Sequence, residues 1–511
     1  MKNYFMYACV ALMLLACNSQ KSKKVVAFAA ITAVPMPPTL SSGQKFPTPA
    51  ATINGWVTNS IVVNNLETNS DILTHGWDIW AALTANTTQS NNGQTLRRFE
   101  TWYTPGDVIT ALRAKEKNST YKLEDIERSH TGYLKPPHQG AAHGNQVTGG
   151  DVVGFVKYDP SSASHIYNND LYYFEKLKKM IKEGEIKNIP PFPNSSVIIK
   201  PVFYPLTKVD SLGADKYSLP AWPGYTGEVT AEILENGFGP SSWSNNIKIT
   251  TTGKTNTAKK VYSINDFIHF KLTKEQAANI INVIDKGVAK EGDYAVLVGM
   301  HVNTRENRRW TWQTFWWSEN PTAPHSPSSK AIAKLQDKVK LDAAAKHYAM
   351  AAAYSMISPV QPNTGGSNSV TRKEFIKESI YAYNPYLEAG FNAATFDIAG
   401  ALTPDPKNPN SGGNPYVNEH YPSGYQNVGA LKLGTRYVGG KLNKVGIESN
   451  CMSCHSQARI YDVPTTKETY QLYVTDQYVD LDAPYFKSSI VLDFVWSIQG
   501  NLMNKDQKKK Y

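Results

Sequence analysis

Three residues near the C-terminal end of the chain have types and a spacing that could do chemistry. The segment NCMSCH, residues 450–455, contains the pattern C-x-x-C-H. Two thiols three residues apart can each bond one vinyl group on the same edge of a porphyrin, and the adjacent histidine then lies beneath the iron. The pattern predicts one covalent haem c, attached through Cys451 and Cys454, with His455 as the proximal iron ligand.

Two other kinds of site use paired cysteines, and the sequence favours neither. A dithiol redox centre typically places C-x-x-C at a helix start in a thioredoxin-like βαβ unit, which the pattern around residue 451 does not predict. A zinc site needs four ligands, and no second cysteine pair exists to complete one. The two remaining cysteines, Cys9 and Cys17, lie in the N-terminal segment.

The motif resembles that of the bacterial c-type cytochromes. The resemblance is confined to C-x-x-C-H and its surroundings, and it implies a haem protein that transfers electrons. The chain differs from the small soluble cytochromes, which carry the motif near their start. It also differs from the dihaem peroxidases and dihaem rubber oxygenases, which need two attachment motifs. The tryptophan-rich segment WTWQTFWW, together with NCMSCH, is similar to large secreted mono-haem proteins of unassigned activity.

The sixth iron ligand decides what such a haem does. Met or His there favours electron transfer, whereas an open position favours binding or activation of a small molecule. Met452 lies inside the attachment loop on the proximal side and cannot reach over. Met503 is the best-placed distal candidate by chain order, against an apolar packing role in the last helix. His347 and Met350 are further candidates, each with a structural role as the alternative.

A second group of candidate residues is aromatic. Residues 294–304 and 309–317 predict a hairpin across the turn 305–308. Pairing of Thr304 with Arg309 would place His301 opposite Trp312 and put both on one face with Trp310. This face could line a haem or substrate pocket, with His301 on the distal side, or it could be the core of a sheet.

The N-terminal segment predicts export and a lipid anchor. Lys2 precedes an apolar run, FMYACVALMLLA, which is too short to span a bilayer and has the length of a signal-peptide core. The run ends in LLAC, which resembles the lipobox of bacterial lipoproteins, so cleavage before Cys17 and lipidation of Cys17 are expected. Asn18 follows and, by resemblance to enterobacterial sorting rules, favours the outer membrane. We expect a lipid-anchored cell-envelope protein that faces the periplasm or the cell surface.

Charge gives no sign of a nucleic-acid partner. The formal net charge is +10, but residues 1–24 contribute four lysines without an acidic residue. The C-terminal tail from Lys505 contributes another +3, which leaves +3 for the long span between these two segments. Lysines in a signal, a tether and a tail are usually solvated. The expected partners are a redox protein or a small molecule, and the membrane through the anchor.

The remaining pattern predicts a mixed α/β (α+β) body followed by a mainly α-helical, cytochrome c-like haem region. Expected segments are a signal peptide (1–16), the lipidated cysteine with a flexible tether (17–50), the α/β body (51–330) and the helical haem-bearing region (331–511). Within them we expect strands at Ser196–Phe203 and Tyr294–Asn303 and helices at Asp170–Glu183, Thr273–Lys286, Ala331–Ile357, Thr371–Tyr383 and Ser489–Met503.

Three functions remain open at this stage. The leading hypothesis is an exported electron-transfer protein. The second is a haem enzyme, of the peroxidase or oxygenase type, with an open distal site inside the aromatic body. The third is a surface ligand-binding lipoprotein with an accessory haem. The size of the body keeps the second and third open, because a haem alone needs only a small domain.

Overall fold

The mixed α/β class expected from the sequence is confirmed, since helices and several sheets alternate along the chain. A computed structural model describes residues 30–63, 70–91, 93–128, 152–213, 215–224, 238–281, 289–354, 384–390, 437–438, 441–442, 455–456, 458–461, 481 and 486–503. The described residues from Ile31 onward belong to one compact unit. The signal peptide, Cys17 and the helix expected at Thr371–Tyr383 lie outside the described residues.

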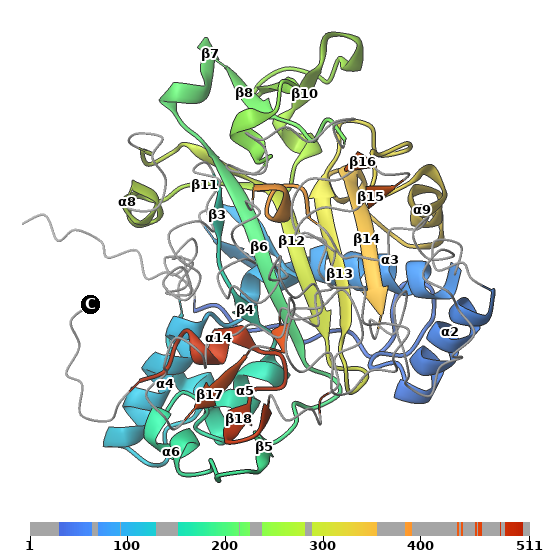
Figure 1. The fold of residues 1–511 in the computed structure, drawn as a ribbon. Coiled ribbons are helices and arrows are strands. Elements are labelled where there is room, and N and C mark those ends of the chain that lie inside the picture. Colours follow the sequence, from blue (N-terminus) through green and yellow to red (C-terminus); the bar gives the residue numbers. More distant parts are fainter. Residues whose placement is uncertain are drawn as a thin grey trace, which may run out of the picture. The chain divides into compact units, whose positions relative to one another are not determined.

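The largest sheet in the described part of the chain has seven strands. Its path runs β14-β13-β12-β6-β3, while β11 and β4 pair with β12 and β6 outside this path. In Figure 1, β6, β12, β13 and β14 are the long arrows that lie side by side. The bounds are β3 (Val153–Gly154), β4 (Lys157–Tyr158), β6 (Val197–Leu206), β11 (His269–Lys271), β12 (Tyr294–Thr304), β13 (Thr311–Trp317) and β14 (Tyr348–Tyr354).

The two strands expected from β-branched and apolar runs, now β6 and β12, are confirmed. The helix expected over Ala331–Ile357 is wrong: α9 (Lys330–Lys334) and a 3-10 turn are followed by strand β14. In the strand the sequence YAMAAAY places alanines at alternate positions, with Tyr348, Met350 and Tyr354 on the other face. Since β14 pairs with β13, the sheet crosses the boundary expected between residues 330 and 331.

The register of the β12–β13 hairpin differs from the expected one by two residues. Thr304 pairs with Thr311 rather than with Arg309, and His301 therefore pairs with Thr314 rather than with Trp312. A shift of two leaves side chains on their faces, so His301 and Trp312 do share one face of the sheet. Trp310 lies outside the strand, in the connecting turn at φ 61°, and is not part of that face.

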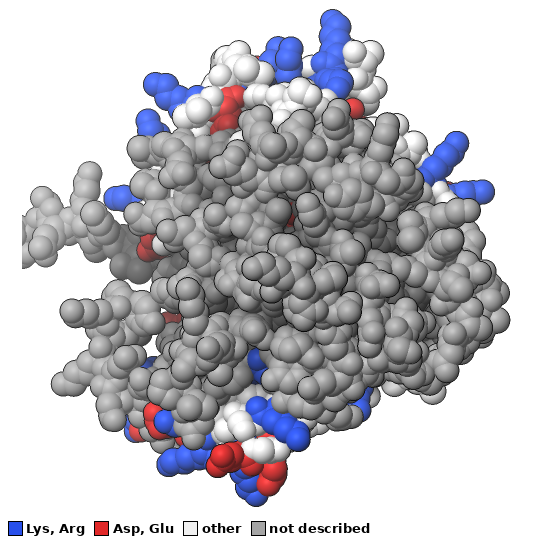
Figure 2. Space-filling model, in the orientation of Figure 1, with Lys and Arg blue, Asp and Glu red and all other residues white. Residues whose placement is uncertain are grey.

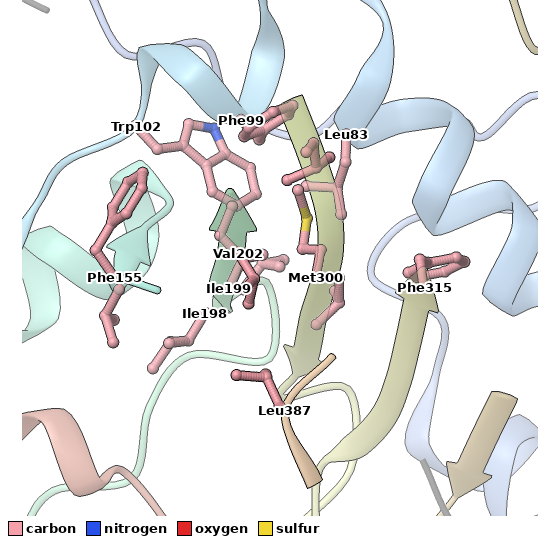
Figure 3. Close-up of a cluster of buried hydrophobic side chains, with 14 of the residues drawn as sticks. Leu83, Phe99, Trp102, Phe155, Ile198, Ile199, Val202, Met300, Phe315 and Leu387 are labelled. Atoms are coloured by element: carbon pink, nitrogen blue, oxygen red, sulfur yellow. The ribbon is translucent and has the colours of Figure 1, made fainter. Parts of the chain in front are cut away.

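Helix α3 (Ser70–Thr84) covers the opposite face of this sheet and lies behind β13 and β14 in Figure 1. Its Trp80 ring stacks on Phe315 with centroids 4.4 Å apart, and such aromatic pairs contribute about 0.5–1.5 kcal/mol beyond their area burial. Figure 3 shows Leu83 of α3, Met300 of β12 and Phe315 of β13 within the buried apolar cluster.

The other described helices have between four and fourteen residues, and the start of α4 follows a local sequence signal. For α4, Thr104 caps the helix, Pro105 occupies the first helical position, and the Asp107 side chain accepts from the Thr104 N–H. The helices are α2 (Ala50–Val63), α4 (Pro105–Lys117), α5 (Pro160–Asn168), α6 (Phe174–Lys178), α8 (Lys274–Ile281) and α14 (Trp496–Gln499). Of these, α6 and α8 fall within the helices expected at Asp170–Glu183 and Thr273–Lys286.

The remaining strands form smaller sheets. Their bounds are β1 (Asn86–Asn91), β2 (Gln94–Arg97), β5 (Ile186–Asn188), β7 (Ser211–Gly213), β8 (Lys216–Pro220), β9 (Asn246–Thr250), β10 (Val261–Ser263), β15 (Tyr437–Val438), β16 (Lys441–Leu442), β17 (Arg459–Tyr461) and β18 (Ser489–Val491). The last helix expected over Ser489–Met503 is therefore a strand followed by the short α14. Asp493 and Phe494 have φ values of 48° and 67°, which interrupt a right-handed helix between the two elements.

The flexible tether expected over residues 17–50 is wrong for its described part. Leu40 and Phe46 are buried in the main apolar cluster, and the indole N–H of Trp102 donates to the Val34 carbonyl. Apolar side chains between the prolines anchor this segment to the body.

Figure 2 shows one face of the molecule, on which described Lys and Arg side chains lie at several separate places, with Asp and Glu beside some of them. The helices within the described residues include none that has the length and apolar character needed to cross a membrane.

Candidate functional site

His455 is the described residue of the C-x-x-C-H motif, and Cys451, Met452 and Cys454 lie outside the described residues. A short turn and a sheet hold the histidine. The Ala458 N–H donates to the His455 carbonyl at 3.1 Å, and the chain then enters β17. Strand β17 pairs with β18, which pairs with β5, so the segment after the histidine is fixed on a three-stranded sheet.

The ring of His455 has a defined hydrogen bond on one nitrogen. Its Nδ1 lies 2.8 Å from the backbone carbonyl oxygen of Phe494, and a carbonyl oxygen can only accept. Nδ1 must therefore carry the hydrogen, and the lone pair of the neutral ring lies on Nε2. Histidines that bind metals typically donate their other ring N–H to a carbonyl or carboxylate in this way, which fixes the tautomer and makes the ligand more basic.

The backbone that presents this carbonyl is strained. Asp493 and Phe494 both lie in the left-handed region, which is unusual for an aromatic residue. Residues held in such regions cost about 1–3 kcal/mol each and persist only where their surroundings enforce them. The Phe494 side chain is buried at 5% exposure, and the Leu492 N–H donates to the Ala458 carbonyl at 2.8 Å.

Trp312 forms one wall of the His455 site. The two ring centroids are 4.6 Å apart at an interplanar angle of 65°, and the Phe494 ring lies 6.3 Å from the Trp312 ring. The Trp312 indole is itself oriented, because its N–H donates to the Arg309 carbonyl at 2.9 Å. The aromatic hairpin of the body and the histidine of the motif thus meet in space.

His301 shares the sheet face of Trp312 and pairs with a carboxylate. Its Nε2 lies 2.7 Å from Glu388 Oε1, and the other oxygen of Glu388 accepts the Asn384 N–H at 2.6 Å. The Asn384 amide in turn donates to Thr314 Oγ1 and to the Phe315 carbonyl, both at 2.9 Å. Segment 384–390 is therefore fixed to this face. A role of His301 as a distal ligand stays a prediction.

The other candidate ligands lie in different surroundings. Met503 is 8% exposed within the apolar cluster, and its backbone pairs with residues 172–174, consistent with a packing role, while its role as a distal ligand stays a prediction. Met350 lies on the α3 face of β14, against Gly76, opposite the face that carries Trp312. His347 stacks on Trp317 at 6.2 Å, and burial lowers its pKa despite the opposing effect of Asp266.

Sequence reasoning missed the Phe494 carbonyl, the Glu388 carboxylate and an ion pair between Arg305 and Asp493. The carbonyl is a backbone group without a residue signature, and the ion pair joins segments far apart in the chain. Among the described residues, no group of three or more His, Cys, Asp or Glu side chains could hold a separate metal ion.

Comparisons with protein-family models, with curated protein sequences and with solved structures found no match to this chain.

Proposed function

We propose that this chain is an exported c-type haem protein that carries one haem on Cys451 and Cys454, with His455 as the proximal ligand. The observation that supports it most is the hydrogen bond from His455 Nδ1 to the Phe494 carbonyl, 2.8 Å long. It selects the tautomer whose Nε2 can bind iron, in the histidine that the sequence motif nominates independently.

The described residues around His455 suit such a ligand. Trp312 gives the ring an apolar neighbour and itself packs near the Phe494 ring, and both of these side chains are buried. A bound haem would supply a one-electron couple, with a potential that depends on the axial ligand, its hydrogen bonds and burial. The chain's own contribution is to orient the imidazole, raise its basicity and limit the access of water to it.

Electron transfer with a redox protein or a small molecule is the activity we favour. We place the protein in the cell envelope, anchored by lipid on Cys17, at the outer membrane on its periplasmic or outer side. The mainly helical, cytochrome c-like character expected for residues 331–511 stays a prediction for the part outside the described residues. The described part contains β14, β17 and β18 as well as α14.

A haem enzyme is the second candidate, and the His301–Glu388 pair favours it. A histidine held by a carboxylate is a common acid–base arrangement, and this pair lies on the sheet face that also carries Trp312. Carbon monoxide distinguishes the two candidates. Rapid binding by the ferrous protein, weakened in His301→Ala, supports the enzyme, whereas resistance supports a six-coordinate electron carrier.

Haem staining of the denatured polypeptide tests the main proposal. The full chain should stain, and the double variant Cys451→Ala, Cys454→Ala should not. Staining that persists in the double variant would contradict attachment at these cysteines. For the anchor, Cys17→Ser should release the protein from the membrane fraction or block its maturation, and unchanged membrane association would contradict lipidation.

A further inference from the structure

The carbonyl that accepts from His455 is presented by a backbone that needs to be held in place. Asp493 and Phe494 are consecutive residues with positive φ, and neither is glycine. Relaxation of either residue toward ordinary φ values would turn the Phe494 carbonyl away from the ring. The contacts of the Asp493 side chain can therefore determine whether the Phe494 carbonyl stays within hydrogen-bond distance of His455 Nδ1.

Two donors hold that side chain. Arg305 Nε donates to Asp493 Oδ2 at 2.8 Å, and the backbone N–H of Phe192 donates to the same oxygen at 3.2 Å. The side chains of Arg305 and Asp493 are only 9% and 13% exposed. At this depth a charged pair is screened much less by salt than a surface pair.

Arg305 is itself fixed by the body. Its backbone N–H donates to the Ser196 carbonyl at 2.9 Å, and its Nη1 donates to the Asn307 carbonyl at 2.6 Å. The next residue, Glu306, is fully buried and accepts from Thr304 Oγ1, the backbone N–H of Thr48 and His75 Nε2. The turn that carries Arg305 is therefore anchored independently of the C-terminal segment.

We infer that Arg305 is a positioning residue for His455: through Asp493 it holds the Phe494 carbonyl against Nδ1, and so sets the tautomer and basicity of the proximal ligand. The inference rests on the proposed function for its redox consequence. A more basic imidazole stabilises ferric over ferrous iron, so the Arg305–Asp493 pair should keep the reduction potential low.

The first test needs no haem. In the full chain with Cys451→Ala and Cys454→Ala, ¹⁵N-labelled histidine rings report which nitrogen carries the hydrogen, and His455→Gln assigns the signal. We expect Nδ1–H in this background. Addition of Asp493→Asn or Arg305→Gln should move the tautomer ratio about tenfold toward Nε2–H, comparable to the smaller effects that outer hydrogen-bond partners have on metal affinity. Folded variants with an unchanged ratio would overturn the inference.

The second test uses the haem-loaded chain and its reduction potential. Arg305→Gln and Asp493→Asn should raise the reduced-to-oxidised ratio at fixed potential about tenfold, or about 59 mV for one electron. Arg305→Lys keeps the positive charge, so its potential should lie between those of the wild type and Arg305→Gln. A potential displaced as far in Arg305→Lys as in Arg305→Gln, or as in Asp493→Asn where Arg305→Gln folds poorly, contradicts positioning by the ion pair.

Asp170→Asn is the matched control. Asp170 also has a positive φ, of 52°, and pairs with Lys115 and Lys176 rather than with Arg305. It should change neither the tautomer nor the potential. A parent chain that acquires no haem would contradict the proposed function alone. If the parent chain carries haem but neither Arg305→Gln nor Asp493→Asn changes its potential or its tautomer ratio, the positioning role alone is contradicted.

Discussion

The ring of Trp312 lies 4.6 Å from the ring of His455, although the two residues belong to a central strand of the body and to the C-terminal motif. The contact links the large α/β body to the residue that the motif nominates as an iron ligand. In the described part of the chain, the body therefore supplies side chains to the candidate haem site.

Trp312→Phe should leave haem attachment intact but change the absorption and electron paramagnetic resonance spectra. The substitution shortens the wall beside His455 and removes the indole N–H bond to Arg309. The free energy of unfolding of the Trp312→Phe variant should be lower than that of the wild type by about 1–3 kcal/mol, as for other substitutions at well-packed buried positions.

Trp222→Phe is the control for Trp312→Phe, since the Trp222 N–H donates to the Ser326 carbonyl at 2.8 Å and its ring packs against Trp243. A similar loss of stability with unchanged spectra is expected there. Identical spectra for wild type and Trp312→Phe would show that Trp312 does not influence the haem.

Glu306→Ala should destabilise the fold strongly. It removes the carboxylate from a fully buried pair with His75 and leaves the partners of that carboxylate unsatisfied. Each buried donor left without its acceptor costs about 1–3 kcal/mol, and Glu306→Gln, which retains an acceptor, should cost less. Denaturant unfolding measures both. Glu185→Ala breaks an exposed pair with Lys187 and should change little. Equal effects of Glu306→Ala and Glu185→Ala would show that the buried contacts of Glu306 do not stabilise the fold.

How far the sequence alone could predict this arrangement depends on the kind of interaction. Strands β6 and β12 were predictable because their short runs of β-branched and apolar residues favour a buried strand. Strand β14 was not, because alanine favours helices and the strand's alternation of small and large side chains is short. The register of the hairpin was not predictable, because it depends on a turn in which Trp310 has a positive φ. The contact with the Phe494 carbonyl was not predictable either, because every residue type has a backbone carbonyl.

Lys157 should make the stability rise with pH above neutrality. Burial lowers the pKa of its ammonium from 10.5 to about 7, against the opposing effects of Asp107 and Glu100. Between these values the unfolded chain binds a proton that the folded chain does not, so the free energy of unfolding increases with pH. Lys157→Met should remove this part of the slope between pH 7 and 10.5. The same slope in both proteins would show that Lys157 is not buried as a neutral amine.

Gly299→Ala should disturb the segment that carries Glu388. A Cβ at residue 299 would lie 2.7 Å from the Asn384 amide nitrogen, so the methyl group would displace the bonds of Asn384 to β13. We expect a loss of about 1–3 kcal/mol in the free energy of unfolding, typical of overpacking.

Gly55→Ala is the control for Gly299→Ala. Nothing lies within 4 Å of its added methyl group, and the residue is within helix α2. The free energy of unfolding of Gly55→Ala should exceed that of the wild type by about 0.5–1 kcal/mol, because glycine inside a helix is destabilising relative to alanine. Two substitutions with the same effect would contradict the close approach at Gly299.

The intact mass of the denatured protein shows directly whether one haem is attached to the chain. The chain should be purified from the envelope of cells that attach haem to other exported proteins. We expect the wild-type chain to be heavier by one haem than the double variant Cys451→Ala, Cys454→Ala, because both chains should carry the same lipid on Cys17. Masses of the two chains that differ only by the two substituted side chains, from cells that load a known c-type cytochrome in parallel, would contradict haem attachment.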